Sequence, residues 1–374
     1  MIFFVVILNL FQQQTALGET GVVGKNNYDV IITNSSIHEQ QEISLFNKHT
    51  KPSLLQIFNT TSFEHVKWNN WDMGCNDLAI SAPYYRAISD RLYKHDQIRK
   101  KFLIFDIGAN TGQDAANIFG TFHEIEGMCK SYNIPYHLIS VEPSPKVFCE
   151  LNDTAKKKRW PGSHPYHFLN IALSDSTGIL KFADPGNEGG SLVLESSTVD
   201  KLGEMNETEF KKAQKCSLQT TTDKKQDDFA MVPTYTMDLL VSSLQNFEIA
   251  SPTDNVFILK IDTEGHDAQV IKGSSSLLDQ KRITFVLFEV WTNRKIKEVA
   301  EFMASKDYLC FLFTPKQLVP VDGKDWWYEN LNEDKDEKWW GNGVCGIRGS
   351  ESMAMFWRMY HSDNLDMVQA FELL

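Results

Sequence analysis

The stretch from Asp106 to Gly112 combines an acidic side chain with two glycines, a pattern that suits the binding of a nucleotide-like ligand. It follows the apolar residues 102–105, which predict a buried strand that ends at this turn. Glycine lets the backbone approach a ligand closely, and a helix that follows would offer its unpaired N–H groups and positive end. Because Asn110 stands between Gly108 and Gly112, the spacing departs from the G-x-G-x-x-G pattern of dinucleotide-binding folds.

A carboxylate after the next predicted strand could bind the ribose of the same ligand. Glu142 ends the apolar segment 137–142. Ligands of doubly wound sheets bind at the carboxyl ends of strands near the switch point, where a carboxylate can accept hydrogen bonds from hydroxyl groups. Asp175 follows a third predicted strand, over 166–173, and could bond an adenine amino group. A turn-forming role explains Asp175 equally well.

A third cluster brings acids and a histidine to the end of another apolar strand. Alternation along that strand places Lys260 and Asp262 on one face, where charges are costly unless they are paired or used in chemistry. Histidine has the ordinary pKa best suited to a base near neutrality, but the sequence does not rank it above an aspartate. A salt-bridged strand end is the alternative interpretation. The candidate catalytic residues, which would orient or deprotonate an acceptor hydroxyl, are Asp262, Glu264 and His266.

The same acids could instead bind a hard cation such as Mg²⁺. Asp262, Glu264 and Glu289 would supply carboxylate oxygens, which are the ligands that this ion prefers. We favour a site without a metal, and the sequence leaves any metal ligands unassigned. Asp267 is expected to cap the helix that begins there.

Six short motifs occur in the order of one known family: DIGANTGQ (106–113), VEPSP (141–145), NIALSD (170–175), TMDLL (236–240), LKIDTEGHDAQVIKG (259–273) and FEV (288–290). Together they resemble the FkbM family of methyltransferases. The resemblance implies a class I methyltransferase fold, which is a mostly parallel, doubly wound α/β sheet with helices on both faces. It also implies S-adenosylmethionine as the cofactor and O-methylation of a sugar or small metabolite. The cofactor-binding residues expected from the motifs are Asp106, Gly108, Ala109, Asn110, Gly112, Gln113, Glu142 and Asp175.

Predicted strands and helices alternate between residues 101 and 315, as in a parallel α/β domain. The last predicted strand, over 308–313, is expected to complete the sheet. The remaining segments are expected to be a signal peptide or membrane anchor (1–18), an N-terminal extension with a covering helix (19–100), a polar exposed insertion (199–228) and a tryptophan-rich segment packed on the domain (316–374).

The N-terminal segment indicates the secretory pathway. Its apolar core of about ten residues suits a signal peptide and is too short to span a bilayer. Six cysteines permit up to three disulfides without fixing their pairing. We expect a Golgi-lumenal or secreted protein, with membrane anchoring through residues 1–18 as the alternative. The route is also consistent with four N-x-S/T sequons, at Asn34, Asn59, Asn152 and Asn206.

Composition narrows the partners. The net charge of −12 argues against a nucleic-acid backbone, and a small-molecule or glycan acceptor is expected instead. A nucleotide-dependent oxidoreductase is one rival, which the missing glycine spacing disfavours. A secreted carbohydrate-binding or interaction protein with this fold and without turnover is the other. The sequence leaves the oligomeric state open.

Overall fold

The structure is a computed structural model. The signal or anchor segment, Gln113, Cys75, Cys129 and the sequons at Asn34 and Asn59 lie outside the residues it describes. Within the described part of the chain, no helix is both long enough and apolar enough to cross a bilayer. The described residues are 84–85, 88–89, 92, 102–112, 136–157, 166–183, 191–193, 202–216, 229–290, 293–313, 318–321 and 341–361.

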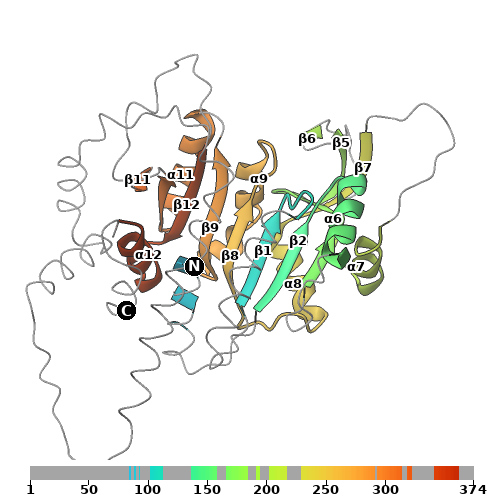
Figure 1. Ribbon diagram of the computed structural model, residues 1–374, viewed down its shortest axis with the longest axis horizontal. Helices are drawn as coiled ribbons and strands as arrows, with labels where there is room; N and C mark the ends of the chain where they lie inside the picture. Colours follow the sequence, from blue (N-terminus) through green and yellow to red (C-terminus); the bar gives the residue numbers. More distant parts are fainter. Residues whose placement is uncertain are drawn as a thin grey trace, which may run out of the picture. The chain divides into compact units, whose positions relative to one another are not determined.

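Eight strands form the main sheet, in the order β11-β10-β12-β9-β8-β1-β2-β3 (Figure 1). Neighbours from β3 to β9 are parallel, whereas β12 is antiparallel to β9 and to β10. The chain runs outward from β1 to β3 and then returns to the other side of β1 with β8, so the switch point lies between β1 and β8. The strands are β1 (Phe102–Ile107), β2 (Tyr136–Val141), β3 (Tyr166–Leu169), β8 (Asn255–Ile261), β9 (Ile283–Val290), β10 (Tyr308–Phe313), β11 (Leu318–Pro320) and β12 (Gly341–Ile347).

This arrangement confirms the predicted doubly wound, mostly parallel α/β sheet. The central strands are continuous apolar runs because parallel strands are covered on both faces, and β1 and β2 are buried along their whole length. The strand order grows in opposite directions from β1, so right-handed connections place α6 and α11 on opposite faces. The helices are α6 (Pro145–Lys157), α7 (Glu207–Ala213), α8 (Met237–Asn246), α9 (Asp267–Lys272), α10 (Ser275–Asp279), α11 (Asn293–Ser305) and α12 (Glu351–His361).

A smaller sheet of four strands follows β3, in the order β4-β7-β5-β6. β4 is parallel to β7, and β5 is antiparallel to β7 and β6. Since β4 begins three residues after β3 ends, this sheet continues from the carboxyl edge of the main sheet. Figure 1 shows β5, β6 and β7 above α6 in this view. Its strands are β4 (Ala172–Leu173), β5 (Gly178–Ala183), β6 (Ser191–Val193) and β7 (Phe229–Tyr235).

The described part of the expected insertion 199–228 does not lie wholly exposed. It contains α7, which begins with a capping box between Asn206 and Glu209 and packs against β3. Phe210 is buried, with its ring centroid 4.9 Å from that of Phe247. Sequence composition missed this contact because one buried aromatic residue among charged neighbours gives almost no hydrophobic signal.

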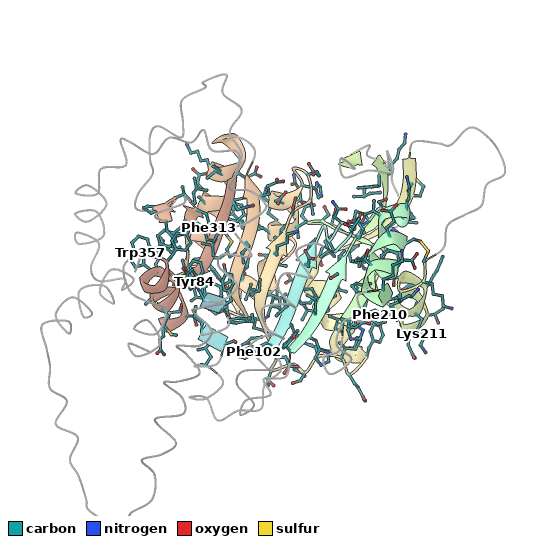
Figure 2. All side chains as sticks on the ribbon, viewed as in Figure 1. Tyr84, Phe102, Phe210, Lys211, Phe313 and Trp357 are labelled. Atoms are coloured by element: carbon teal, nitrogen blue, oxygen red, sulfur yellow. A yellow bond between two sulfur atoms is a disulfide. The ribbon has the colours of Figure 1, made fainter. Side chains whose placement is uncertain are left out.

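The expectation that β10 completes the sheet is wrong, because β12 is inserted between β9 and β10. The glycines of β12 obscured it, since glycine is depleted in strands. At Gly343 a Cβ atom would lie 2.4 Å from the Phe288 ring, so the close packing of this strand requires glycine. The described part of the C-terminal segment thus packs on the core. Trp357 of α12, labelled in Figure 2, has its ring centroid 5.0 Å from that of Phe311.

The covering helix expected within residues 19–100 is present, because the described positions 84–85, 88–89 and 92 are all helical. Tyr85 and Ile88 are fully buried, and the Tyr85 ring stacks on Phe356 with centroids 5.2 Å apart. Two disulfides join elements of the described chain. Cys310–Cys345 links β10 to β12, and Cys149–Cys216 links α6 to the residues after α7.

Candidate functional site

A pocket opens at the carboxyl ends of β1, β2 and β8, beside the switch point where doubly wound sheets bind ligands. The ends of the three strands supply its polar side, and α6 together with the smaller sheet supplies an apolar side. The lining residues are Ile107, Gly108, Asn110, Val141, Glu142, Pro143, Ser144, Val147, Ala172, Leu173, Phe182, Asp262, Thr263 and Glu264.

The turn after β1 has three residues in the left-handed region: Gly108 (φ 75°), Asn110 (φ 48°) and Gly112 (φ 87°). Asparagine tolerates this region better than most side chains, which explains how Asn110 replaces a glycine here. Its Oδ1 accepts a hydrogen bond from the Thr111 N–H at 2.7 Å. The N–H groups of Gly108 and Ala109 donate to the Val141 carbonyl at 2.9 and 3.0 Å, so the turn is held against the end of β2.

Gly108 also brings two of the sequence motifs into direct contact. A Cβ atom at this position would lie 1.7 Å from the carbonyl oxygen of Asp262. The Asp262 N–H donates to the Ile107 carbonyl at 2.9 Å, which continues the pairing of β1 with β8 beyond the strand. Gly108 is therefore needed for the packing of these two turns as well as for any approach to a ligand.

Glu142 is almost fully buried at the pocket, and its carboxylate joins two backbone segments. Oε2 accepts the Asn110 N–H at 2.9 Å, and Oε1 accepts the Ser144 N–H at 2.8 Å. Burial raises the pKa of Glu142 to about 7, against the opposing effect of these two N–H donors. Each carboxylate oxygen has a second lone pair, so further hydroxyl donors can still be accepted.

Lys260 is a buried cation beneath the same turn. Its Nζ lies 3.1 Å from Oδ1 of the fully buried Asp106 and 3.6 Å from Oδ2 of Asp262. It also lies 3.4 Å from the Gly108 carbonyl oxygen. The expectation that Lys260 and Asp262 share a face of the strand is confirmed. Asp106 does not line the pocket, so its visible role is to pair with this lysine.

The segment after β8 separates its acids from its histidine. Asp262, whose side chain is 38% exposed, lines the pocket together with the exposed Glu264. Glu264 has a φ of 50°, an unusual value for a residue other than glycine, which reflects the tight turn at this strand end. His266 is buried and does not line the pocket, and its Nε2 lies 2.9 Å from Oγ of Ser174.

Asp267 does not cap α9 as expected. The N-cap residue is His266, which makes no side-chain capping bond. The Asp267 carboxylate instead accepts hydrogen bonds from the Thr263 hydroxyl at 3.1 Å and from the Glu289 N–H at 3.3 Å. Burial, followed by the nearby Asp262 charge, raises the pKa of Asp267 to about 6. Asp267 thus links the turn after β8 to the end of β9.

The pocket gathers only part of the predicted set. Five of the expected residues line it, and the apolar wall was not expected. Ala172 and Leu173 lie within the NIALSD motif that pointed to this strand end, whereas Phe182 comes from the smaller sheet and gave no sequence signal. Asp175 is exposed and accepts a hydrogen bond from the Ser174 hydroxyl at 3.2 Å. The expected residues that are described but do not line the pocket are Asp106, Ala109, Gly112, Asp175 and His266.

The metal alternative gains no support from side-chain geometry. In the described residues, no group of three or more His, Cys, Asp or Glu side chains is placed to hold a metal ion. Glu289 does not line the pocket with Asp262 and Glu264.

The fold and pocket define a class of protein. A doubly wound parallel sheet with one long antiparallel strand inserted near its end is the class I methyltransferase arrangement. The sequence model of the Methyltransferase FkbM domain matches residues 106–310, which is more than half of the chain. The chain therefore belongs to the FkbM family of methyltransferases, as its motifs indicated. It is an S-adenosylmethionine-dependent methyltransferase, and no curated protein matches its sequence.

Solved structures that resemble the chain do so at low identity. The plantazolicin methyltransferase BpumL in complex with SAH is 9% identical, covers 83% of this chain and 96% of its own, and has a TM-score of 0.25. BpumL with a monoazolic desmethylPZN analog and SAH is 10% identical, the match covers 84% of this chain and 99% of that chain, and the TM-score is 0.27. A Listeria monocytogenes protein assigned to the class I methyltransferases is 10% identical, the match covers 83% of this chain and 79% of that chain, and the TM-score is 0.25. The fold assignment therefore rests on the strand order of this chain and on the family match.

Proposed function

We propose that this protein transfers the methyl group of S-adenosylmethionine to a hydroxyl oxygen of a sugar or small metabolite. The observation that carries the proposal is a single pocket lined by the buried carboxylate of Glu142 and the partly exposed carboxylate of Asp262. When bound, S-adenosylmethionine supplies an activated methyl group that needs little covalent assistance. The protein has to hold the donor, place the acceptor oxygen and receive its proton.

The pocket residues fit a nucleoside with an amino-acid tail. Glu142 can accept hydrogen bonds from the ribose hydroxyls through its remaining lone pairs. Val147, Leu173 and Phe182 form an apolar wall suited to the adenine ring. The turn after β1, with Gly108 and Asn110 in the pocket, is the side left for the methionine end.

Asp262 is the favoured group for orienting the acceptor hydroxyl and receiving its proton. It lines the pocket and faces Lys260 at 3.6 Å, whereas His266 is buried against Ser174. The carboxylates of Asp262 and Glu264 make this side of the pocket negatively charged, so they would repel an acceptor that carries a phosphate or carboxylate group. Carboxylates accept hydrogen bonds from neighbouring hydroxyl groups, so a neutral, hydroxyl-rich acceptor fits this side of the pocket best.

The proposal is tested by titration with S-adenosylhomocysteine followed by a methyl-transfer assay on neutral and acidic sugars. We expect transfer to neutral sugars and a rate about 10²–10⁴-fold lower in Asp262→Asn, with donor affinity retained. Asp153→Asn, which removes an exposed acid on α6, is the matched control. Donor binding without transfer to any hydroxyl acceptor would favour the carbohydrate-binding alternative, and no donor binding by the folded protein would refute the donor site.

We also propose that the protein enters the secretory pathway. The two disulfides support this, because disulfides persist mainly in oxidising compartments. Of the two described sequons, Asn206 is an exposed N-cap residue, whereas the Asn152 amide donates to the Phe148 carbonyl within α6. We expect mass spectrometry of protein from secretory cells to find a glycan at Asn206 in preference to Asn152. Cytosolic protein without any glycan would contradict the route.

A further inference from the structure

Asn170 connects α7 with the turn that carries Glu142. It stands between β3 and β4, and its backbone N–H donates to the Ala213 carbonyl at the end of α7, at 2.8 Å. Its side-chain Nδ2 donates to the carbonyl oxygens of Glu142 at 2.9 Å and Pro143 at 3.0 Å. One amide group thus holds two consecutive carbonyls of the turn after β2.

The turn held by Asn170 fixes the direction of the Glu142 carboxylate. The Glu142 N–H donates to the Leu169 carbonyl at 3.0 Å, so the backbone on both sides of this residue is bonded to the end of β3. The carboxylate in turn accepts the N–H groups of Asn110 and Ser144. A shift of the turn would therefore move the carboxylate and the two segments that it joins.

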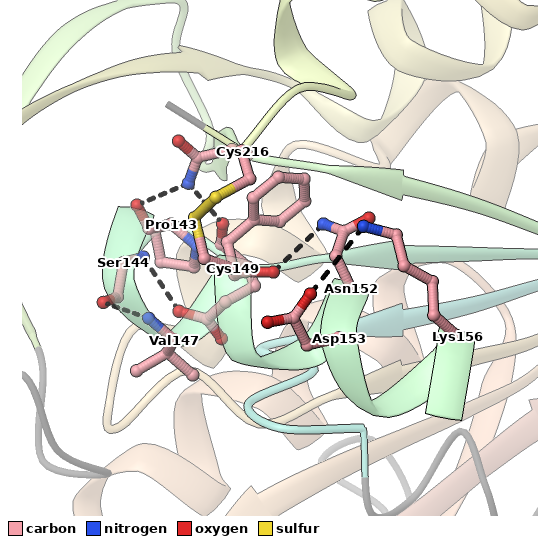
Figure 3. The surroundings of a disulfide bond; sticks show 11 residues. Pro143, Ser144, Val147, Cys149, Asn152, Asp153, Lys156 and Cys216 are labelled. Atoms are coloured by element: carbon pink, nitrogen blue, oxygen red, sulfur yellow. Dashed lines mark hydrogen bonds and ion pairs between the residues drawn. A yellow bond between two sulfur atoms is a disulfide. The ribbon is translucent and has the colours of Figure 1, made fainter. Parts of the chain in front are cut away.

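A disulfide fixes the other end of this connection. Cys149 lies in α6, two residues after the pocket-lining Val147, and is bonded to Cys216 just beyond α7. Figure 3 draws the surroundings of this disulfide, with Pro143 and Ser144 just before α6 and Val147 in its first turn. Cys149 is buried but Cys216 is an exposed residue, so this bond is the more accessible of the two disulfides to a soluble reductant. By contrast, Cys310 and Cys345 are both buried.

We propose that Asn170 is a positioning residue for donor binding, and that the Cys149–Cys216 disulfide supports it by holding α7 in place. The inference rests on the proposed role of Glu142 in binding the donor. The Asn170 side chain bonds to backbone carbonyls of the turn and does not line the pocket, so it acts through Glu142. Reduction of the disulfide removes the covalent link between α6 and the end of α7, so that only hydrogen bonds and the packing of Phe210 hold the Ala213 carbonyl against Asn170. Donor affinity then depends on the redox state of this cysteine pair.

Substitution of Asn170 tests the first part. Asn170→Asp keeps the shape and the backbone N–H but removes both side-chain donors, and Asn170→Ala removes them without adding charge. For both we expect S-adenosylhomocysteine to bind about tenfold more weakly, since two hydrogen bonds are lost. Turnover at saturating donor should stay within about twofold, because the loss falls on donor binding. Asn152→Asp, which removes a similar bond to the Phe148 carbonyl in α6, is the matched control and should bind normally.

Hydrogen exchange on the wild-type protein tests the second part without a substitution that could impair folding. Selective reduction, followed by alkylation of Cys216, should speed exchange of the Asn110 and Ser144 amides and weaken donor binding together. Unchanged exchange and affinity after complete alkylation would overturn the role of the disulfide. If Asn170→Ala binds the donor normally while Glu142→Gln does not, the positioning role is wrong and the donor site stands. If Glu142→Gln also binds normally, the proposed donor site itself fails.

Discussion

Replacement of Lys260 by methionine should destabilise the protein through the charge it leaves behind. Lys260 Nζ lies 3.1 Å from Asp106 Oδ1, with the two side chains 6% and 0% exposed. Removing one partner of a buried ion pair costs about 3–5 kcal/mol, because the remaining charge is uncompensated. Methionine fills a similar volume, so little of this cost comes from packing. We therefore expect the free energy of unfolding of Lys260→Met to fall by about 3–5 kcal/mol.

The double variant Lys260→Met/Asp106→Asn distinguishes charge from packing. It removes both buried charges, so it should be more stable than Lys260→Met alone. Urea unfolding followed by circular dichroism, with disulfides intact, compares the wild type, Lys260→Met, Asp106→Asn and the double variant, and these four stabilities give the coupling energy. Lys272→Met breaks the half-exposed pair with Glu298 and should cost only about 0–1 kcal/mol. The reasoning is refuted if the double variant loses the sum of the single losses, or if Lys260→Met costs no more than Lys272→Met.

Three further outcomes follow from the site. The pKa of Glu142 is raised from 4.5 to about 7, so the stability it contributes is present below pH 4.5 and is lost as the pH rises through about 7. Donor affinity should rise over the same window as the carboxylate ionises, and titrations in Glu142→Gln should show no such dependence. Gly108→Ala should fail to fold or lose donor binding, because its Cβ would lie 1.7 Å from the Asp262 carbonyl oxygen. The control Gly178→Ala should melt like the wild type, because a Cβ atom there would have no other heavy atom within 4 Å. His266→Gln should keep turnover within about tenfold, because the buried ring contacts Ser174 outside the pocket. A loss in His266→Gln as large as that of Asp262→Asn would restore His266 as the base.

The parallel core was predictable because its strands carry their own signal. β1, β2 and β8 are apolar runs that end in polar turns, and each was expected close to its observed place. The position of β12 was not predictable, since the need for glycine at Gly343 and Gly346 comes from the Phe288 and Met353 side chains that pack against them. Likewise, α7 has one buried aromatic residue, and its anchoring depends on a disulfide to Cys149 that lies 67 residues away in sequence.

The sequence alone determined the chemistry available at the strand ends. Asp106, Glu142 and Asp262 each follow an apolar run, and a parallel sheet brings such ends to one edge. The roles of these acids depended on distances between segments far apart in the chain. Asp106 forms a buried ion pair with Lys260, whereas Glu142 and Asp262 line the pocket.

Local pattern specifies strands, turns and residue types because these depend on near neighbours in the chain. Burial, charge pairing and pocket lining depend on which distant segments meet. For this reason only the tertiary structure could place His266 against Ser174 and bring Asn170 to the Glu142 turn.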